Sequence, residues 1–321
     1  MMRLVLAEAH RLLSRRFTRL ALIALLLGLA GFQLVVNDAL SPLTGARLAA
    51  AQRAYEESHT DWVDSHRNYE QECRDSGGTS EECTFPEPTL AEYRVEPTPF
   101  KEVAPTALEL STALVALIAF MIAASFIGAE YSSGSITNWL TFIPRRGHVF
   151  WSKLLTLIGF TALLGALSSA ITLAAALVLA RLYGSHVESL RELAEMGARG
   201  VLAVIGLAVL GFCIGLVTRH TAGPIGILLG YGVVWILRMG ILGEQAWTQR
   251  MTRWTPDGNL AAIVDHGFTY SVPAETVTAE GVNIDYIEHT ISLTHGIAYW
   301  SILLILVVLG SLLIFHRRDV V

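Results

Sequence analysis

Few side chains in this 321-residue chain are arranged for bond-making chemistry. The only two lysines, Lys101 and Lys153, do not follow the glycine that a phosphate-binding loop requires, and no metalloprotease or serine-hydrolase motif occurs. The histidines lack the spacing of metal ligands. We therefore expect no enzyme activity and no cofactor or metal bound by this chain, and the remaining patterns suit non-covalent recognition.

The polar, basic stretch 128–153, between two long apolar runs, has the pattern of a docking element. Four apolar residues after Gly134-Ser135 share one face of a helix, a proline ends it, and two arginines follow at its negative end. These residues are Ile136, Trp139, Leu140, Ile143, Pro144, Arg145 and Arg146. Such a ridge suits a groove on another protein, and the alternative is an interfacial helix among lipid headgroups.

Composition indicates an integral membrane protein, because 53% of the residues are apolar and only 16% are charged. Six apolar runs approach or exceed the roughly 20 residues that a hydrocarbon core needs, and they must be helical to satisfy their backbone. The runs are 17–36, 107–128, 152–180, 200–217, 222–243 and 296–315.

Basic residues set the orientation. Segments 1–19, 129–153, 218–221 and 316–321 hold 11 of the 23 basic residues but only three of the 28 acidic ones. Positive charge stays inside, so we expect both termini, the loop 129–151 and the tail 316–321 in the cytoplasm.

Residues 1–16 are predicted to form an amphipathic helix lying flat at the membrane surface. Its apolar face holds Val5, Ala9, Leu12 and Leu13, and its polar face holds Glu8, Arg11 and Arg15. The alternative is a simple basic flank to the first span.

The outer segment 37–106 repeats an apolar or aromatic residue every seven positions, at Leu48, Tyr55, Trp62 and Tyr69. A long helix with this stripe is expected to pack against a partner helix or a second copy. The less favoured alternative is that the stripe binds cargo. Cys73 and Cys83 flank a turn-rich loop on this outer, oxidising side and are expected to form a disulfide.

The second outer segment, 244–295, carries Trp247 and Trp254, which favour a re-entrant or surface-lying helix. Arg238, in the outer half of the fifth span, is costly there unless it snorkels or pairs. Glu109 is the carboxylate at comparable depth on another span and the expected structural partner, and the alternative role of Arg238 is contact with cargo or gating. The motifs Gly211-x3-Gly215 and Gly226-x3-Gly230 predict that spans four and five pack as a tight hairpin.

The sequence Gly-Ala-Glu-Tyr around Glu130, the run Ile-Thr-Asn-Trp-Leu, and Ile-Pro-Arg-Arg-Gly before Lys153 resemble the cytoplasmic loop of ABC type-2 permeases. The similarity covers about 26 residues, and the layout of spans agrees along the chain. In that family this loop carries the coupling helix that touches a separate ATPase. The resemblance therefore implies that Glu130 and the docking residues contact such a partner.

The resemblance implies an all-α membrane protein of the bacterial inner membrane with six spans, an N-terminal amphipathic helix, a cytoplasmic coupling helix and extracellular helical or loop segments. Two copies of the permease would stand on two ATPase subunits that bind ATP and Mg²⁺, with no nucleic acid among the partners. Span faces without midplane charge favour an amphipathic or hydrophobic cargo such as an antibiotic, peptide or lipid. The alternatives are a signalling or scaffold protein that acts through its outer segment, and an ion-coupled carrier.

Overall fold

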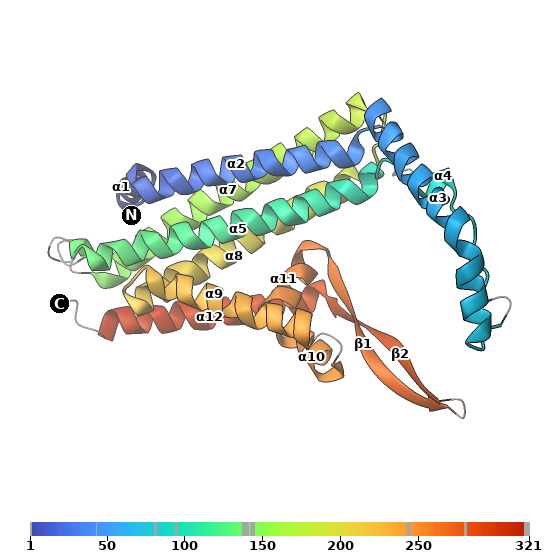
Figure 1. Ribbon diagram of the computed structural model, residues 1–321. Helices are drawn as coiled ribbons and strands as arrows, with labels where there is room; N and C mark the ends of the chain where they lie inside the picture. Colours follow the sequence, from blue (N-terminus) through green and yellow to red (C-terminus); the bar gives the residue numbers. More distant parts are fainter. Residues whose placement is uncertain are drawn as a thin grey trace.

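The computed structural model describes residues 2–42, 44–79, 82–93, 96–136, 141, 145–242, 245–278 and 281–317. Among these residues, six helices are long and apolar enough to cross a membrane, which confirms a helical multi-pass membrane protein. They are α2 (Arg16–Leu40), α5 (Phe100–Ser132), α7 (Arg146–Leu182), α8 (Leu190–Thr218), α9 with η1 (Ala222–Ile241) and α12 (Leu293–Arg317). Figure 1 shows the first helix, α1 (Met2–Ser14), and the end of α12 at one end of the bundle, which we call the terminal end; the opposite one is the far end.

Helices α5 and α8 form the centre of the bundle, because their apolar stretches are the most buried of the six. Small residues bring the two together. A side chain at Gly211 would lie 2.5 Å from the backbone oxygen of Phe120, so only glycine allows this approach. Gly226 and Gly230 on α9, by contrast, have open space where a side chain would begin. The predicted tight hairpin of spans four and five is therefore wrong, and α8 packs against α5.

The first helix, α1 (Met2–Ser14), lies beside the beginning of α7. Its buried face holds Leu12 and Glu8, which are 0% and 2% exposed, whereas Leu13 is exposed. The expected division of this helix, with Glu8 on the polar face, is wrong. Glu8 is buried because a cation on a neighbouring helix faces it, which helical periodicity within one segment does not reveal.

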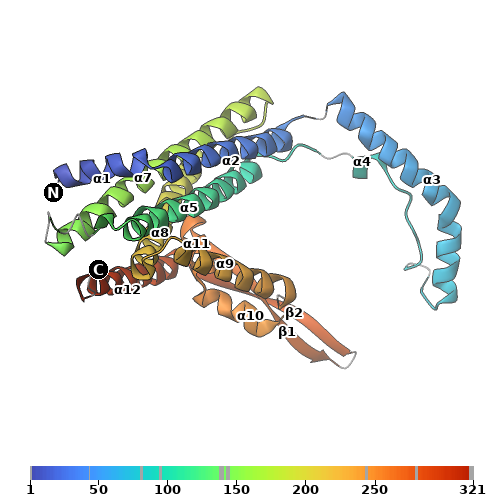
Figure 2. The same ribbon diagram turned by 60° about the vertical axis from the view of Figure 1, so that its left-hand side comes forward.

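Beyond the far end, α3 (Gly45–Asp75) projects away from the bundle as a single long helix (Figures 1 and 2). The chain that follows it, which includes α4 (Leu90–Tyr93), contacts part of its aromatic stripe, whereas Leu48 and Tyr69 are 39% and 57% exposed. Trp62 donates its indole N–H to the Phe85 carbonyl at 3.1 Å, and the ring of Tyr55 lies 6.2 Å from that of Tyr93. The stripe is therefore only partly covered within one chain, and packing of its exposed residues against a partner helix or a second copy stays a prediction.

A disulfide joins Cys73, near the end of α3, to Cys83 on the returning chain. The bond closes the turn at the tip of this arm and holds the return segment against the helix. The third cysteine, Cys213, is buried in α8.

The region between the last two spans, expected to form a re-entrant or surface-lying helix, contains short helices followed by two strands. It begins with α10 (Ala246–Met251), the short 3-10 turn η2 (Thr252–Trp254) and α11 (Pro256–Val264). Two antiparallel strands follow, β1 (Gly267–Thr278) and β2 (Gly281–Ser292), in a register that pairs Gly267 with Ser292. Alternating aromatic and β-branched residues favour these strands, a period of two that the expectation of a helix overlooked.

Candidate functional site: a buried charge cluster beside the docking loop

The predicted docking loop joins the end of α5 to the beginning of α7 at the terminal end of the bundle. Four of its predicted docking residues lie outside the described residues: Trp139, Leu140, Ile143 and Pro144. Ile136 is described, and it is 1% exposed in the main apolar core with Phe150 and Phe315. Ile136 therefore anchors the loop to the bundle, and its predicted place on a docking ridge is wrong.

The two arginines at the end of the loop belong to α7. Arg145 is the residue before the helix, and Arg146 is its first residue. Arg146 donates to the backbone carbonyls of Phe315 and His316 at 3.1 and 3.2 Å. A cation at the end of a helix satisfies carbonyls that lack an intrahelical partner, so Arg146 caps α12. Arg146 was expected at the C-terminus of the docking helix, whose last residues lie outside the described residues, and the C-terminus that it contacts is that of α12.

Four ionisable side chains meet next to this loop, inside the bundle. Lys153 on α7 places its Nζ 2.8 Å from Oε2 of Glu8 and 2.7 Å from Oε2 of Glu130, the latter near the end of α5. Arg15, between α1 and α2, reaches Oε1 of Glu130 at 2.8 Å. Two cations and two carboxylates therefore balance, and they join four segments of the chain.

The cluster is almost entirely shielded from solvent. The side chains of Lys153, Glu8 and Glu130 are only 1–3% exposed, and that of Arg15 is 21% exposed. The ring of Phe126 lies against both cations, 4.9 Å from the Lys153 ammonium and 5.1 Å from the Arg15 guanidinium. Buried charges are costly unless paired, so every member of this cluster depends on the others.

Glu130 was expected to contact a partner protein, and its burial makes it an internal link between helices. The sequence reasoning missed Glu8, Arg15 and Lys153 as members of one site. One signal was present: Lys153 and Glu130 are charges inside the ends of apolar helices, where an unpaired charge is unfavourable.

A second polar network surrounds Arg238, which lies in the π-helical turn η1 (Leu237–Ile241) after α9. Its Nη2 is 2.7 Å from Oδ2 of Asp257, and its Nη1 donates to Oγ1 of Thr252 at 3.0 Å. Tyr231 and Trp235 also donate to Asp257. The predicted pairing of Arg238 with Glu109 is wrong, because Asp257 at the start of α11 folds back to the same depth.

This correction changes the expected stability measurements. Arg238→Leu and Asp257→Asn should each lower the melting temperature, and the double variant should lose less than the sum of the two. Glu109→Gln serves as the matched control, and its effect should add to that of Arg238→Leu. Additive losses for Arg238 and Asp257 would contradict the pairing.

An apolar cavity of about 340 Å³ lies beside this network, between α5, α8, α9, α11 and α12. Leu207, Leu210 and Ile214 of α8 line it together with Leu228 and Trp300. A pocket of this size and character suits the hydrophobic part of a small molecule.

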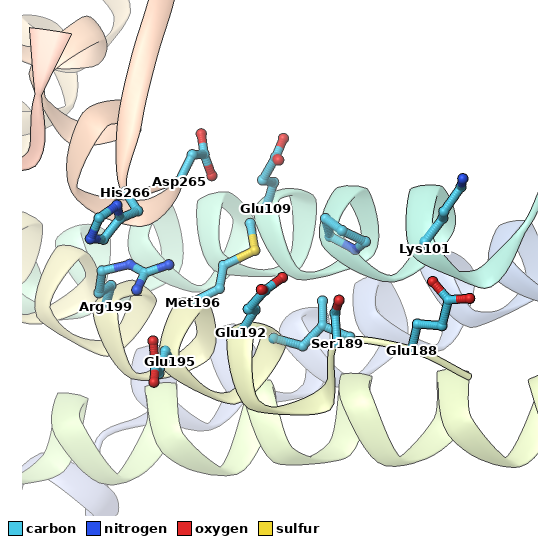
Figure 3. Close-up of a pocket in the computed structure, with 12 residues that line it drawn as sticks. Lys101, Glu109, Glu188, Ser189, Glu192, Glu195, Met196, Arg199, Asp265 and His266 are labelled. Atoms are coloured by element: carbon cyan, nitrogen blue, oxygen red, sulfur yellow. The ribbon is translucent and has the colours of Figure 1, made fainter. Parts of the chain in front are cut away.

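At the far end, a second cavity of about 490 Å³ opens between α5, α8 and the turn from α11 to β1. Figure 3 shows Glu109 and Asp265 on one side of it and Glu192 and Glu195 on the α8 side. Arg199 donates its Nε–H to the Val264 carbonyl at 3.0 Å, which fixes the guanidinium at the pocket wall.

Burial, with a smaller contribution from the nearby Glu109 carboxyl, raises the pKa of Asp265 to about 6, and Arg199 opposes the shift. A carboxyl whose pKa is raised in the folded state stabilises that state below its unfolded pKa of about 4, and this contribution is lost as the pH rises through about 6. The melting temperature of Asp265→Asn should therefore be higher than that of the wild type at pH 7.5 and equal to it near pH 4. A difference that is the same at both pH values would contradict this assignment.

A family model described as ABC-2 family transporter protein matches residues 89–235, from the segment before α5 to the last turns of α9. The match includes Glu130, Lys153 and the docking loop. No curated protein and no solved structure matches the chain.

Proposed function

The chain belongs to the ABC-2 transporter permease family, and we propose that it is the membrane subunit of an exporter for an amphipathic or hydrophobic compound. Permeases of this family generally lack an ATPase of their own. In the proposed assembly, two copies of the chain stand on two ABC ATPase subunits that bind ATP and Mg²⁺. Both termini and the docking loop face the cytoplasm of a bacterial inner membrane.

The buried cluster of Glu8, Arg15, Glu130 and Lys153 is the observation that carries this proposal. It ties α1, the start of α2, the end of α5 and the start of α7 into one unit at the docking loop. A force applied to the loop by a closing ATPase would move these segments together. Because α5 packs closely on α8, the motion would reach the centre of the bundle.

The apolar cavity beside α5 and α9 supports a hydrophobic cargo. Its lining offers almost no charge to bind an ion or sugar, apart from Asp257, which Arg238 already neutralises. Helix α9 has a single buried residue, Pro224, among those described, so most of its surface is available to lipid or to a second copy. Cargo held between two copies near α5 and α9 is consistent with this exposure.

The test uses the chain purified from its native host, with co-purifying proteins identified. A separate chain with a phosphate-binding loop should accompany it, and small amphipathic compounds should stimulate its ATP hydrolysis. Leu210→Trp, which fills the cavity, should abolish the stimulation. Leu202→Trp, on the exposed side of the same helix, should preserve it.

Two results would count against export. If no ATPase accompanies the chain, the ABC transporter assembly itself is wrong. If an ATPase is present but no amphipathic compound stimulates it, signalling through the projecting arm of α3 becomes the better account.

A further inference from the structure

The hairpin of β1 and β2 leaves the bundle and extends away from the helices on which it is rooted (Figures 1 and 2). It is a two-stranded sheet, and a two-stranded hairpin alone in water is marginally stable. Near its middle, Ile284, Tyr286 and Ile287 are 58%, 66% and 53% exposed. Exposed apolar residues on an uncovered strand are typical of a protein contact.

The two outer edges of this hairpin differ. Pro273 of β1 lies opposite Tyr286 of β2, and a proline in a paired strand turns its nitrogen away from the partner strand. Because it has no N–H, Pro273 interrupts the donors along the outer edge of β1. In an antiparallel pair, two residues directly opposite each other point their N–H groups either both toward the partner strand or both away from it. Because Tyr286 lies opposite Pro273, the N–H groups of Tyr286 and of its alternate neighbour Glu288 point outward. The edge of β2, which contains no proline, is thus the one open to another strand.

We propose that β2 pairs edge to edge with β2 of a second copy of this chain, which makes a four-stranded sheet across the permease dimer. This inference rests on the homodimer of the proposed function. A two-fold axis makes the strands antiparallel and brings one residue opposite its own copy.

Charge selects the register of this pairing. If the two-fold axis passed at Asp285 or at Glu288, that carboxylate would lie opposite its own copy. If the axis passed at Tyr286, both carboxylates would lie opposite isoleucines of the second copy. An axis at Ile287 places Ile287 against its copy and Asp285 opposite the second copy's His289. A carboxylate opposite an imidazole in place of a like charge, together with a central apolar pair, favours this arrangement.

The position of α9 fits the same dimer. Figures 1 and 2 place α9 next to α10, at the root of the hairpin, and α9 exposes most of its apolar surface. A second copy that packs against α9 would bring its own hairpin to the same region.

The test is oxidative cross-linking of the full-length Ile287→Cys variant, purified with its ATPase. Ile287 pairs with Val272, so across the outer edge it occupies a non-hydrogen-bonded site, where opposing Cβ atoms lie about 4.5–5.5 Å apart. That spacing is close to the one found in disulfides. Covalent dimers should form, whereas Ser271→Cys, on β1 at a similar height, should give none. The native cysteines add little background, since Cys213 is buried and the other two are bonded to each other.

A second variant separates edge pairing from chance collision. Tyr286→Pro removes an outward N–H and leaves the bonds to β1, as Pro273 does on the other strand. Added to Ile287→Cys, it should abolish the cross-link while the protein still melts as before.

The mass of each uncross-linked sample distinguishes the possible failures. A dimer by mass that gives no cross-link at Ile287, or an equal one at Ser271, overturns the β2 pairing and leaves the homodimer standing. A monomer by mass overturns both.

Discussion

Replacing Lys153 by methionine should destabilise the protein by about 3–5 kcal/mol, because it leaves Glu8 and half of Glu130 buried without a counter-charge. Thermal melting in detergent measures this loss. Lys101→Met is the matched control, since Lys101 is the only other lysine and is exposed. Lys101→Met should melt like wild type.

The double variant Glu8→Gln with Lys153→Met tests whether the cluster also transmits motion. Removing one charge of each sign leaves the pair of Arg15 and Glu130 intact, so much of the lost stability should return. The link between α1 and α7 is still missing, and stimulation of the ATPase by cargo should stay below wild type. A double variant with additive losses would contradict the cluster, and one with full stimulation would reduce it to a structural role.

Replacing Trp139 and Leu140 by aspartate should abolish co-purification of the ATPase and leave membrane insertion intact. Both residues belong to the apolar ridge that the sequence predicts for the docking loop, and a buried carboxylate in an interface costs several kcal/mol. Co-purification from membranes measures the association. Asn138→Asp, on the opposite face of the same predicted helix, should retain the partner, and unchanged association of the double variant would remove the coupling assignment.

The six spans were predictable because each is a continuous apolar run, and a membrane allows such a run only one regular structure. The disulfide between Cys73 and Cys83 also followed from short separation in sequence. The spans need only local information, and the disulfide also needs the outer placement of 37–106 that the distribution of basic residues predicts.

The corrected residues depend on contacts that sequence spacing does not contain. Helical periodicity places Glu8 on a polar face. In the structure Glu8 is buried because it pairs with Lys153, which is 145 residues away in the sequence. Arg238 pairs with Asp257 because α11 returns to the depth at which Arg238 lies in the bundle. Glu109 was the expected partner because only depths along straight spans were compared. Gly211 faces α5 because helix order in space differs from helix order in sequence.

The hairpin was missed for a different reason. The tryptophans of 244–295 do belong to short helices or turns, and this signal was extended over residues whose alternation has a period of two. Pro273 within β1 is unfavourable in a strand in general and acceptable only at an outer edge, which the structure shows it occupies.

The most direct test of the account is uptake of an amphipathic compound into inside-out vesicles that contain this chain and its ATPase. We predict uptake that requires ATP and that disappears in the Trp139→Asp, Leu140→Asp variant. ATP hydrolysis in the wild-type vesicles without any uptake would contradict export.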